Sequence, residues 1–322
     1  MATSTPTSFS DYLKGMKRLV YGVILGFVAL MVTLETSYSQ NSQQGVVAFE
    51  RGDFTVAYRE FQALAKKGNA NAQFNLGQMY RTGIGTSKNY KKAAVWYQKS
   101  ATRGNSKALL SLGNMHNQGL GVIQDFKEAV KWFRRSAEIG NAGAQFNLGT
   151  MYKNGRGVSQ DYEEAFNWYR RSAEQGDPDA QYHLALMYRS GEGVTQNSEA
   201  ALKWYIKSAE QGNADAQYNL ALMHRVGESV PQNDSQAVRW YRKSAEKGHE
   251  KAQVNLGVMY AKGKGVSQNN VFAHMWINIA ASNGEITAVK NRGIIAKNMT
   301  SEQIAQAQKL AKECVNKKYT GC

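Results

Sequence analysis

The chain has 322 residues, and 40 Lys and Arg against 25 Asp and Glu give it a formal net charge of +15 at pH 7. Hydrophobic residues make up 42% and the mean hydropathy is −0.53, which excludes an intrinsically disordered chain and a multi-span membrane protein. The two cysteines exclude a disulfide-dense scaffold.

The first segment has the features of a secretory signal. A basic stretch precedes an apolar run at residues 19–34, and small residues, Ser37 and Ser39, stand before a cleavage position at Gln40. We therefore expect a signal peptide over residues 1–39, with Met16 as an alternative start of translation, and a periplasmic or secreted bacterial protein. The alternative is an uncleaved anchor in the inner membrane, although the run is short for a span of about 20 residues.

Residues 69–284 repeat with a period of 36 residues, in six units without gaps. Such a period is typical of stacked repeat architectures. Every tryptophan keeps the period, and so do the glycines that end the units. These residues are Trp96, Trp132, Trp168, Trp204, Trp240 and Trp276, with Gly104, Gly140, Gly176, Gly212, Gly248 and Gly284.

Each unit reads as two helices. In the third unit Ala144 and Leu148 begin the apolar face of a first helix, and Gly155 suits the left-handed position that ends it. Asp161 opens the second helix, and Glu164 predicts a capping box with it. The sequence therefore predicts an all-α fold. The same N-cap position holds Asn89, Asp125, Asp161, Asn197, Asn233 and Asn269.

The unit AQFNLGTMYKNGRGVSQDYEEAFNWYRRSAEQG resembles Sel-one-like repeats (SLR), the relatives of tetratricopeptide repeats, and the resemblance covers residues 45–297. It implies a right-handed α/α superhelical solenoid of helix-turn-helix repeats that acts as an adaptor holding other proteins. The family shares no catalytic residue set, so we expect no catalytic residue, cofactor or metal. The fifth unit departs from the pattern at residues 227–231 (GESVP), where we expect an altered loop.

Both ends are predicted to be caps. Residues 40–68 keep Ala57 in phase but have Glu60 in place of Trp, as in a partial first repeat. Residues 285–322 contain a last helix that opens with a capping box at 300–303, followed by a tail. We expect Cys314 and Cys322 to form an intramolecular disulfide in an oxidising compartment. Unpaired thiols or an intermolecular bond are the alternatives.

The second helices carry a row of basic residues. Four of its members have a glutamate three residues later, which predicts stabilising ion pairs on a solvated outer face. The row is Lys99, Arg135, Arg171, Lys207 and Lys243, and the glutamates are Glu138, Glu174, Glu210 and Glu246.

The first helices carry a second basic row, which is the candidate partner-binding site together with a neighbouring apolar row. First helices line the concave side in folds of this kind, and basic rows steer acidic partners. The alternatives are that the cations complement helix dipoles and that the apolar residues pack between units. The basic row is Arg81, Lys153, Arg189 and Arg225. At the position that holds Gln78, Asn114 and Thr150 in the first three units, the later units have Leu186, Leu222 and Val258.

Three histidines at repeat positions are interpreted as structural. His116 and His224 replace a tyrosine and are three units apart, so they cannot share a metal ion. His183 replaces an asparagine of the first helix.

These observations favour a secreted or periplasmic scaffold that binds a protein partner through a concave groove. The partner is expected to be acidic or to offer an extended segment. An envelope hydrolase acting on the cell wall or on a lactam, and a binder of an anionic envelope polymer, are the alternatives. Nucleic acid is disfavoured as a partner by secretion. A steep loss of affinity with salt would indicate the polymer.

Overall fold

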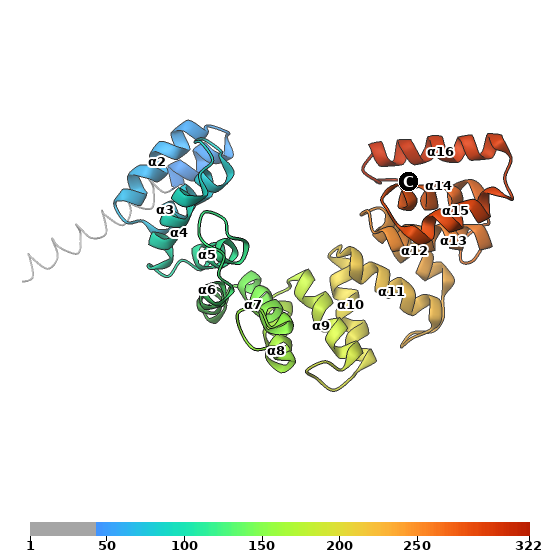
Figure 1. The fold of residues 1–322 in the computed structure, drawn as a ribbon, viewed down its shortest axis with the longest axis horizontal. Coiled ribbons are helices and arrows are strands. Elements are labelled where there is room, and N and C mark those ends of the chain that lie inside the picture. Colours follow the sequence, from blue (N-terminus) through green and yellow to red (C-terminus); the bar gives the residue numbers. More distant parts are fainter. Residues whose placement is uncertain (1–42) are drawn as a thin grey trace, which may run out of the picture. The chain divides into compact units, whose positions relative to one another are not determined.

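The computed structural model describes residues 43–322, and over this range every regular element is a helix. The predicted signal peptide at residues 1–39 lies outside the described residues. No helix within residues 43–322 has the length and apolar character needed to cross a membrane. Residues 43–50 are helical and precede the helices of Figure 1. These are α2 (Phe54–Lys66), α3 (Ala70–Thr82), α4 (Tyr90–Ala101), α5 (Ser106–Gln118), α6 (Phe126–Glu138), α7 (Ala142–Asn154), α8 (Tyr162–Glu174), α9 (Pro178–Ser190), α10 (Ser198–Glu210), α11 (Ala214–Val226), α12 (Asp234–Ala245), α13 (Glu250–Lys262), α14 (Asn270–Ser282), α15 (Ile286–Ala296) and α16 (Ser301–Asn316).

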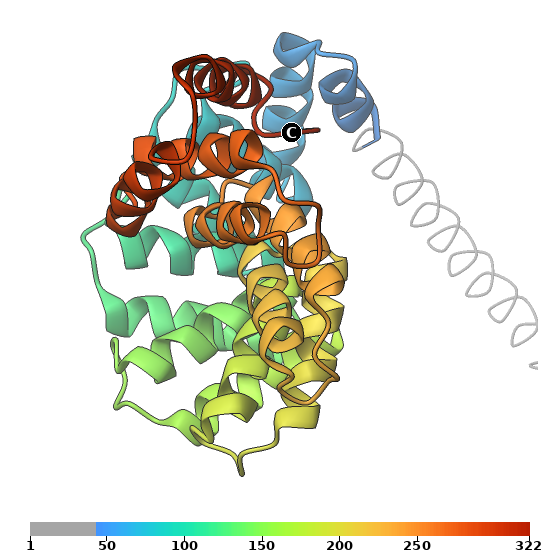
Figure 2. The same cartoon turned by 90° about the vertical axis from the view of Figure 1, so that its right-hand side faces the viewer.

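The described chain forms two compact units, which we describe separately. The N-terminal unit ends at Asp125 and contains α2 to α5, and the C-terminal unit runs from Phe126 to Cys322 and contains α6 to α16. In the C-terminal unit α7 packs on α8, α9 on α10, α11 on α12 and α13 on α14, and each pair stacks on the next (Figures 1 and 2). The fold is an all-α solenoid of helix pairs, as the sequence predicts.

Side chains at the N-cap position begin the second helices. The side chains of Asn89, Asp161 and three later Asn residues each accept a hydrogen bond from a backbone N–H in the first turn. Only one of the two hydrogen bonds of the capping box predicted at Asp161 forms. The Asp161 side chain accepts the backbone N–H of Glu164, but the backbone N–H of Asp161 donates to the carbonyl oxygen of Tyr152. Glu164 Oε2 instead accepts a hydrogen bond from Trp168 Nε1 at 3.0 Å, so the second half of the prediction is wrong. The box predicted at Thr300 and Gln303 is complete.

The turn between the two helices of a repeat requires glycine for space as well as conformation. Gly157 has φ 73°, and a Cβ there would lie 2.3 Å from the carbonyl oxygen of Phe126. In the fifth repeat Ser229 stands at this position and keeps a left-handed backbone, with φ 59°. The sequence predicts an altered loop here, and that prediction is wrong for the backbone of Ser229, which keeps the conformation of the glycine. A left-handed backbone costs conformational energy in a residue that has a Cβ.

The basic row of the second helices packs over tryptophan rings. The predicted ion pairs with the glutamates are wrong, since none forms within residues 43–322. Each cation instead lies 4.2 to 5.0 Å from the ring centroid of the tryptophan three residues earlier. An indole that is buried or half-buried competes well with an exposed carboxylate, whose ion pairs in water are weak. The pairs are Lys99 with Trp96, Arg135 with Trp132, Arg171 with Trp168, Lys207 with Trp204 and Lys243 with Trp240.

Candidate functional site

Three members of the first-helix basic row lie in the C-terminal unit, at the last turns of consecutive first helices. Lys153 lies on α7, Arg189 on α9 and Arg225 on α11, and all three are partly exposed. No hydrogen bond or ion pair joins Lys153 or Arg225 to another side chain of the described chain. Arg81, the fourth member, lies on α3 in the N-terminal unit.

Arg189 differs from its neighbours because it is paired. Its Nε and Nη2 donate to the two carboxylate oxygens of Glu228, at 3.0 and 2.8 Å, and Nη1 donates to Asn219 Oδ1 at 3.3 Å. Glu228 belongs to the turn after α11, so the pair links the fourth repeat to the fifth. The sequence interpretation missed Glu228, although it lies in the segment that departs from the GxGV pattern.

The apolar row is half-buried. Leu186 packs against the core around Tyr205, and Leu222 and Val258 pack against the core around Tyr241. Each of the three keeps part of its side chain at the surface. These residues therefore both pack against the helix core and keep part of their surface exposed.

The residue at the position of this apolar row determines whether a buried tyrosine hydroxyl of the same repeat has a hydrogen-bond partner. In the N-terminal unit Tyr97 donates to Gln78 Oε1 at 2.7 Å. In the third repeat the hydroxyls of Tyr169 and Thr150 are 3.0 Å apart and share a hydrogen bond. The sequence interpretation did not connect these positions, although they are separated by 19 residues in both repeats.

The fourth and fifth repeats lack this hydrogen bond. Leu186 and Leu222 replace the acceptor, and the buried hydroxyls of Tyr205 and Tyr241 have no hydrogen-bond partner among the described residues. Burial raises the pKa of each to about 12. The nearby arginine charge opposes this, as does a polar side chain beside each hydroxyl, Arg189 at Tyr205 and Asn255 at Tyr241, but neither side chain has the geometry of a hydrogen bond. Both hydroxyls stay protonated. An unsatisfied buried hydroxyl costs about 1–3 kcal/mol. The two leucines therefore stand at these positions at a cost in stability.

The histidines lie in packed surroundings. His183 stacks on Tyr169, with ring centroids 5.2 Å apart, and also contacts Phe146. Burial, helped by the charge of Lys153, lowers its pKa to about 4. No three His, Cys, Asp or Glu side chains of the described chain come close enough to hold a metal ion.

Arg81 lines a pocket in the N-terminal unit with a volume of about 380 Å³. Residues 43–50 contribute Val46, Phe49 and Glu50, and α3 contributes Phe74 and Gln78 as well as Arg81. The sequence interpretation found Arg81 through its period but missed Val46 and Phe49, which lie in the atypical first repeat.

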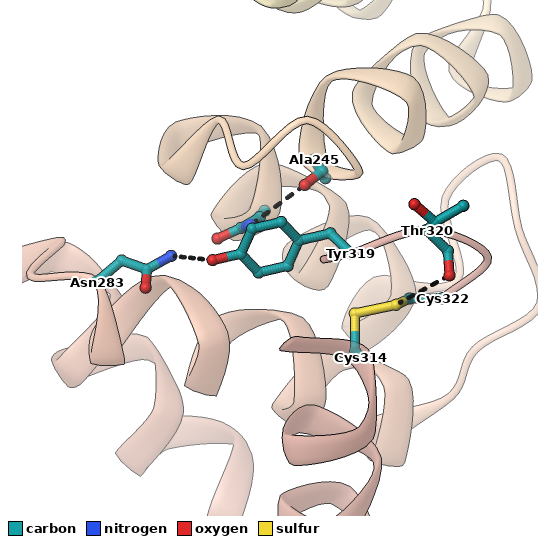
Figure 3. The surroundings of a disulfide bond; sticks show 7 residues. Ala245, Asn283, Cys314, Tyr319, Thr320 and Cys322 are labelled. Carbon is teal, nitrogen blue, oxygen red and sulfur yellow. Dashed lines mark hydrogen bonds between the residues drawn. A yellow bond between two sulfur atoms is a disulfide. The ribbon is translucent and has the colours of Figure 1, made fainter. Parts of the chain in front are cut away.

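The tail after α16 folds back onto the C-terminal unit. Cys314 and Cys322 are joined by a disulfide, which closes the tail into a loop (Figure 3). Between them Tyr319 accepts a hydrogen bond from Asn283 Nδ2 at 3.3 Å, and its ring lies beside Gly248, where it would touch any added Cβ. The tail therefore bridges the turn before α13 and the end of α14.

Comparisons with known proteins agree with this architecture. The Sel1 repeat family profile matches six consecutive segments, residues 70–105, 106–141, 142–177, 178–213, 214–249 and 250–285. The crystal structure of a Sel1 repeat protein from Oxalobacter formigenes is 33% identical, with a TM-score of 0.71, and the match covers 75% of this chain and 99% of that one. A protective antigen of uropathogenic Escherichia coli with an SLR fold is 34% identical, with a TM-score of 0.58, over 88% of this chain and 70% of that one. No curated protein matches the chain.

The helix pairs, the period and these matches lead to one assignment. The chain belongs to the Sel1 repeat family.

Proposed function

We propose that the protein is a periplasmic or secreted scaffold that binds an extended segment of a partner protein along α9, α11 and α13, without catalysis of its own. Members of the Sel1 repeat family generally mediate protein–protein interactions. The secretory pattern of residues 14–40 and a disulfide that persists in oxidising compartments support the location.

The proposal rests on Leu186 and Leu222, which stand where a hydrogen-bond acceptor for the buried hydroxyls of Tyr205 and Tyr241 would be. Leu186 and Leu222 give up hydrogen bonds that Gln78 and Thr150 make in other repeats of the same chain. Proteins depart from optimal local hydrogen bonding chiefly at functional sites, and a partly exposed apolar surface is what the two leucines supply in exchange.

The chemistry of the two rows describes the partner. Successive side chains of an extended segment point to opposite sides, so those facing the groove recur at every second residue. Apolar side chains would contact Leu186, Leu222 and Val258. Acidic ones would pair with Arg225 on α11, and with Lys153 where the segment extends to the preceding first helix, α7. The net charge of +15 favours the approach of an acidic segment.

The test uses peptide display against the immobilised protein, with affinities of selected peptides measured by fluorescence anisotropy. Leu186→Thr together with Leu222→Thr recreates the arrangement of Thr150 and Tyr169. We expect about tenfold weaker binding from the lost apolar contacts, while the melting temperature stays the same or rises.

The reverse substitution, Thr150→Leu, is the matched control and should lower the melting temperature. Selected peptides that bind the double variant equally well would contradict the proposal. Competition by dextran sulfate with a steep salt dependence, and no selected peptide, would favour an anionic polymer as ligand.

A further inference from the structure

The pocket beside Arg81 leaves apolar side chains partly exposed in the N-terminal unit. Val46, Phe49 and Ile84 are 40%, 37% and 36% exposed, and all three line the pocket together with Phe61 and Phe74. Its volume of about 380 Å³ is near the lower end of the range, about 300–1,000 Å³, of sites that hold small ligands. The pocket is thus large enough for a single apolar group.

The guanidinium of Arg81 is held in place at this pocket. Its Nε donates to Gln78 Oε1 at 2.7 Å, and the same oxygen accepts the hydroxyl of Tyr97 at 2.7 Å. Tyr97 is fully buried, so its hydroxyl anchors Gln78, and Gln78 orients Arg81. The charged guanidinium also interacts with the Tyr97 hydroxyl beside it. No other partner within residues 43–322 engages the two Nη groups, which remain available for a carboxylate in the planar geometry that arginine prefers.

We infer that this pocket binds the C-terminal residue of a partner polypeptide, with the apolar side chain among the phenylalanines and the terminal carboxylate on Arg81. A C-terminal residue carries its side chain and its carboxylate on one Cα, so both can enter one small site. An apolar residue followed by an internal Asp or Glu cannot do this in an extended segment, because neighbouring side chains point to opposite sides.

Glu50 completes the recognition site. It is the acidic residue among those that line the pocket, and no ion pair joins it to Arg81 in the described chain. Its carboxylate can accept the amide N–H of the bound residue. The site rests on contacts of the N-terminal unit alone, so it is independent of the groove proposed for α9 to α13.

The test measures binding of three fluorescein-labelled peptides to the full chain by anisotropy. The first ends in Gly-Ser-Gly-Phe with a free carboxylate, and the second is the same peptide with a C-terminal amide. The third has an internal Phe-Asp and an amide end. We expect the free acid to bind at least about tenfold more tightly than either other peptide, as the loss of a charge-assisted hydrogen-bonded pair predicts.

Variants separate this site from the groove. Arg81→Gln should weaken binding of the free acid to the level of the amide, and Ile84→Asp, or Phe49→Ala if that variant melts early, should weaken all three peptides. Arg225→Gln, the matched control at the same repeat position, should change none of them.

Two results would overturn the inference. One is equal affinity for the acid and the amide, including failure of both to bind at millimolar concentration. The other is an equal loss of affinity for the free acid in Arg81→Gln and Arg225→Gln, which would assign binding to general charge attraction or to the groove.

Discussion

The guanidinium of Arg189 donates two hydrogen bonds to the carboxylate of Glu228, 39 residues later in the chain. The pair connects the end of α9 to the turn after α11. The corresponding positions one repeat later hold Arg225 and Lys264, two like charges. One repeat earlier they hold Lys153 and Glu192, which form no ion pair within residues 43–322, so among the described residues the link joins the fourth and fifth repeats alone.

Breaking this pair should lower stability modestly. Both side chains are about one-third exposed, and ion pairs at such sites contribute about 1 kcal/mol or less. We expect Glu228→Gln to lower the free energy of unfolding by about 0.5–1 kcal/mol at low salt, and less at high salt. Arg189→Glu should cost more, because it places two carboxylates together, whereas Arg225→Glu should cost little. Urea unfolding of the three variants checks this order, and equal losses for the two arginine variants would contradict it.

The tyrosine hydroxyls predict stability changes of opposite sign. Tyr205→Phe removes an unpartnered buried hydroxyl and should raise the unfolding free energy by about 1 kcal/mol. Tyr169→Phe removes a hydroxyl that is bonded to Thr150 and should lower it by about the same amount. Urea midpoints at unchanged slope measure both effects. A loss of stability in Tyr205→Phe would show that its hydroxyl has a partner in solution.

Lowering the pH should destabilise the protein through its buried histidines. Burial lowers the pKa of His183 to about 4, and also lowers the pKa of His224, His249 and His274. A base whose folded pKa is lowered stabilises the fold above its unfolded pKa, near 6.5, and this contribution is lost as the pH falls. For His183 the loss is complete near pH 4 and amounts to roughly 3 kcal/mol.

His183→Asn tests the largest of these contributions, because asparagine stands at the same position in α7 and α11. Melting temperatures between pH 4 and 8 should fall less steeply for this variant than for the parent chain. Parallel curves would mean that His183 titrates normally in the folded state.

Because the cations of the second helices stack on tryptophan, we expect the cation, and not the glutamate three residues later, to contribute to stability. Lys207→Met should lower stability by about 0.5–1 kcal/mol, because the ammonium lies 4.4 Å from the ring centroid of Trp204. Glu210→Gln should have almost no effect. Thermal unfolding of both variants decides between the two partners, and a larger effect from Glu210→Gln would restore the ion-pair interpretation.

Removing the disulfide should loosen the C-terminal end locally. Cys314→Ser together with Cys322→Ser should cost no more than about 3 kcal/mol, because the closed loop is short. Hydrogen exchange should rise at the end of α16 and near Gly248, where Tyr319 packs. Mass spectrometry of non-reduced, alkylated protein tests the bond itself, and two alkylated cysteines per chain would exclude it.

The sequence by itself determined the repeats, the helix pairs and most of their ends. Trp168, Gly155 and Asp161 recur with one period, and each acts within a turn or two of its own helix, so local physics was sufficient to place them. The candidate rows were also visible, because side chains on one helix face recur at the same repeat positions.

Only the tertiary structure decided which partners these side chains choose. Lys207 has Trp204 and Glu210 at equal distances along the helix, and the choice between them depends on how the indole ring lies. The pair of Arg189 with Glu228 depends on how successive repeats stack, since no local rule joins residues 39 positions apart. The pocket at Arg81 depends on Val46 and Phe49, which belong to a first repeat that lacks the periodic signature. These contacts required the packed chain because each joins groups from different helices or turns.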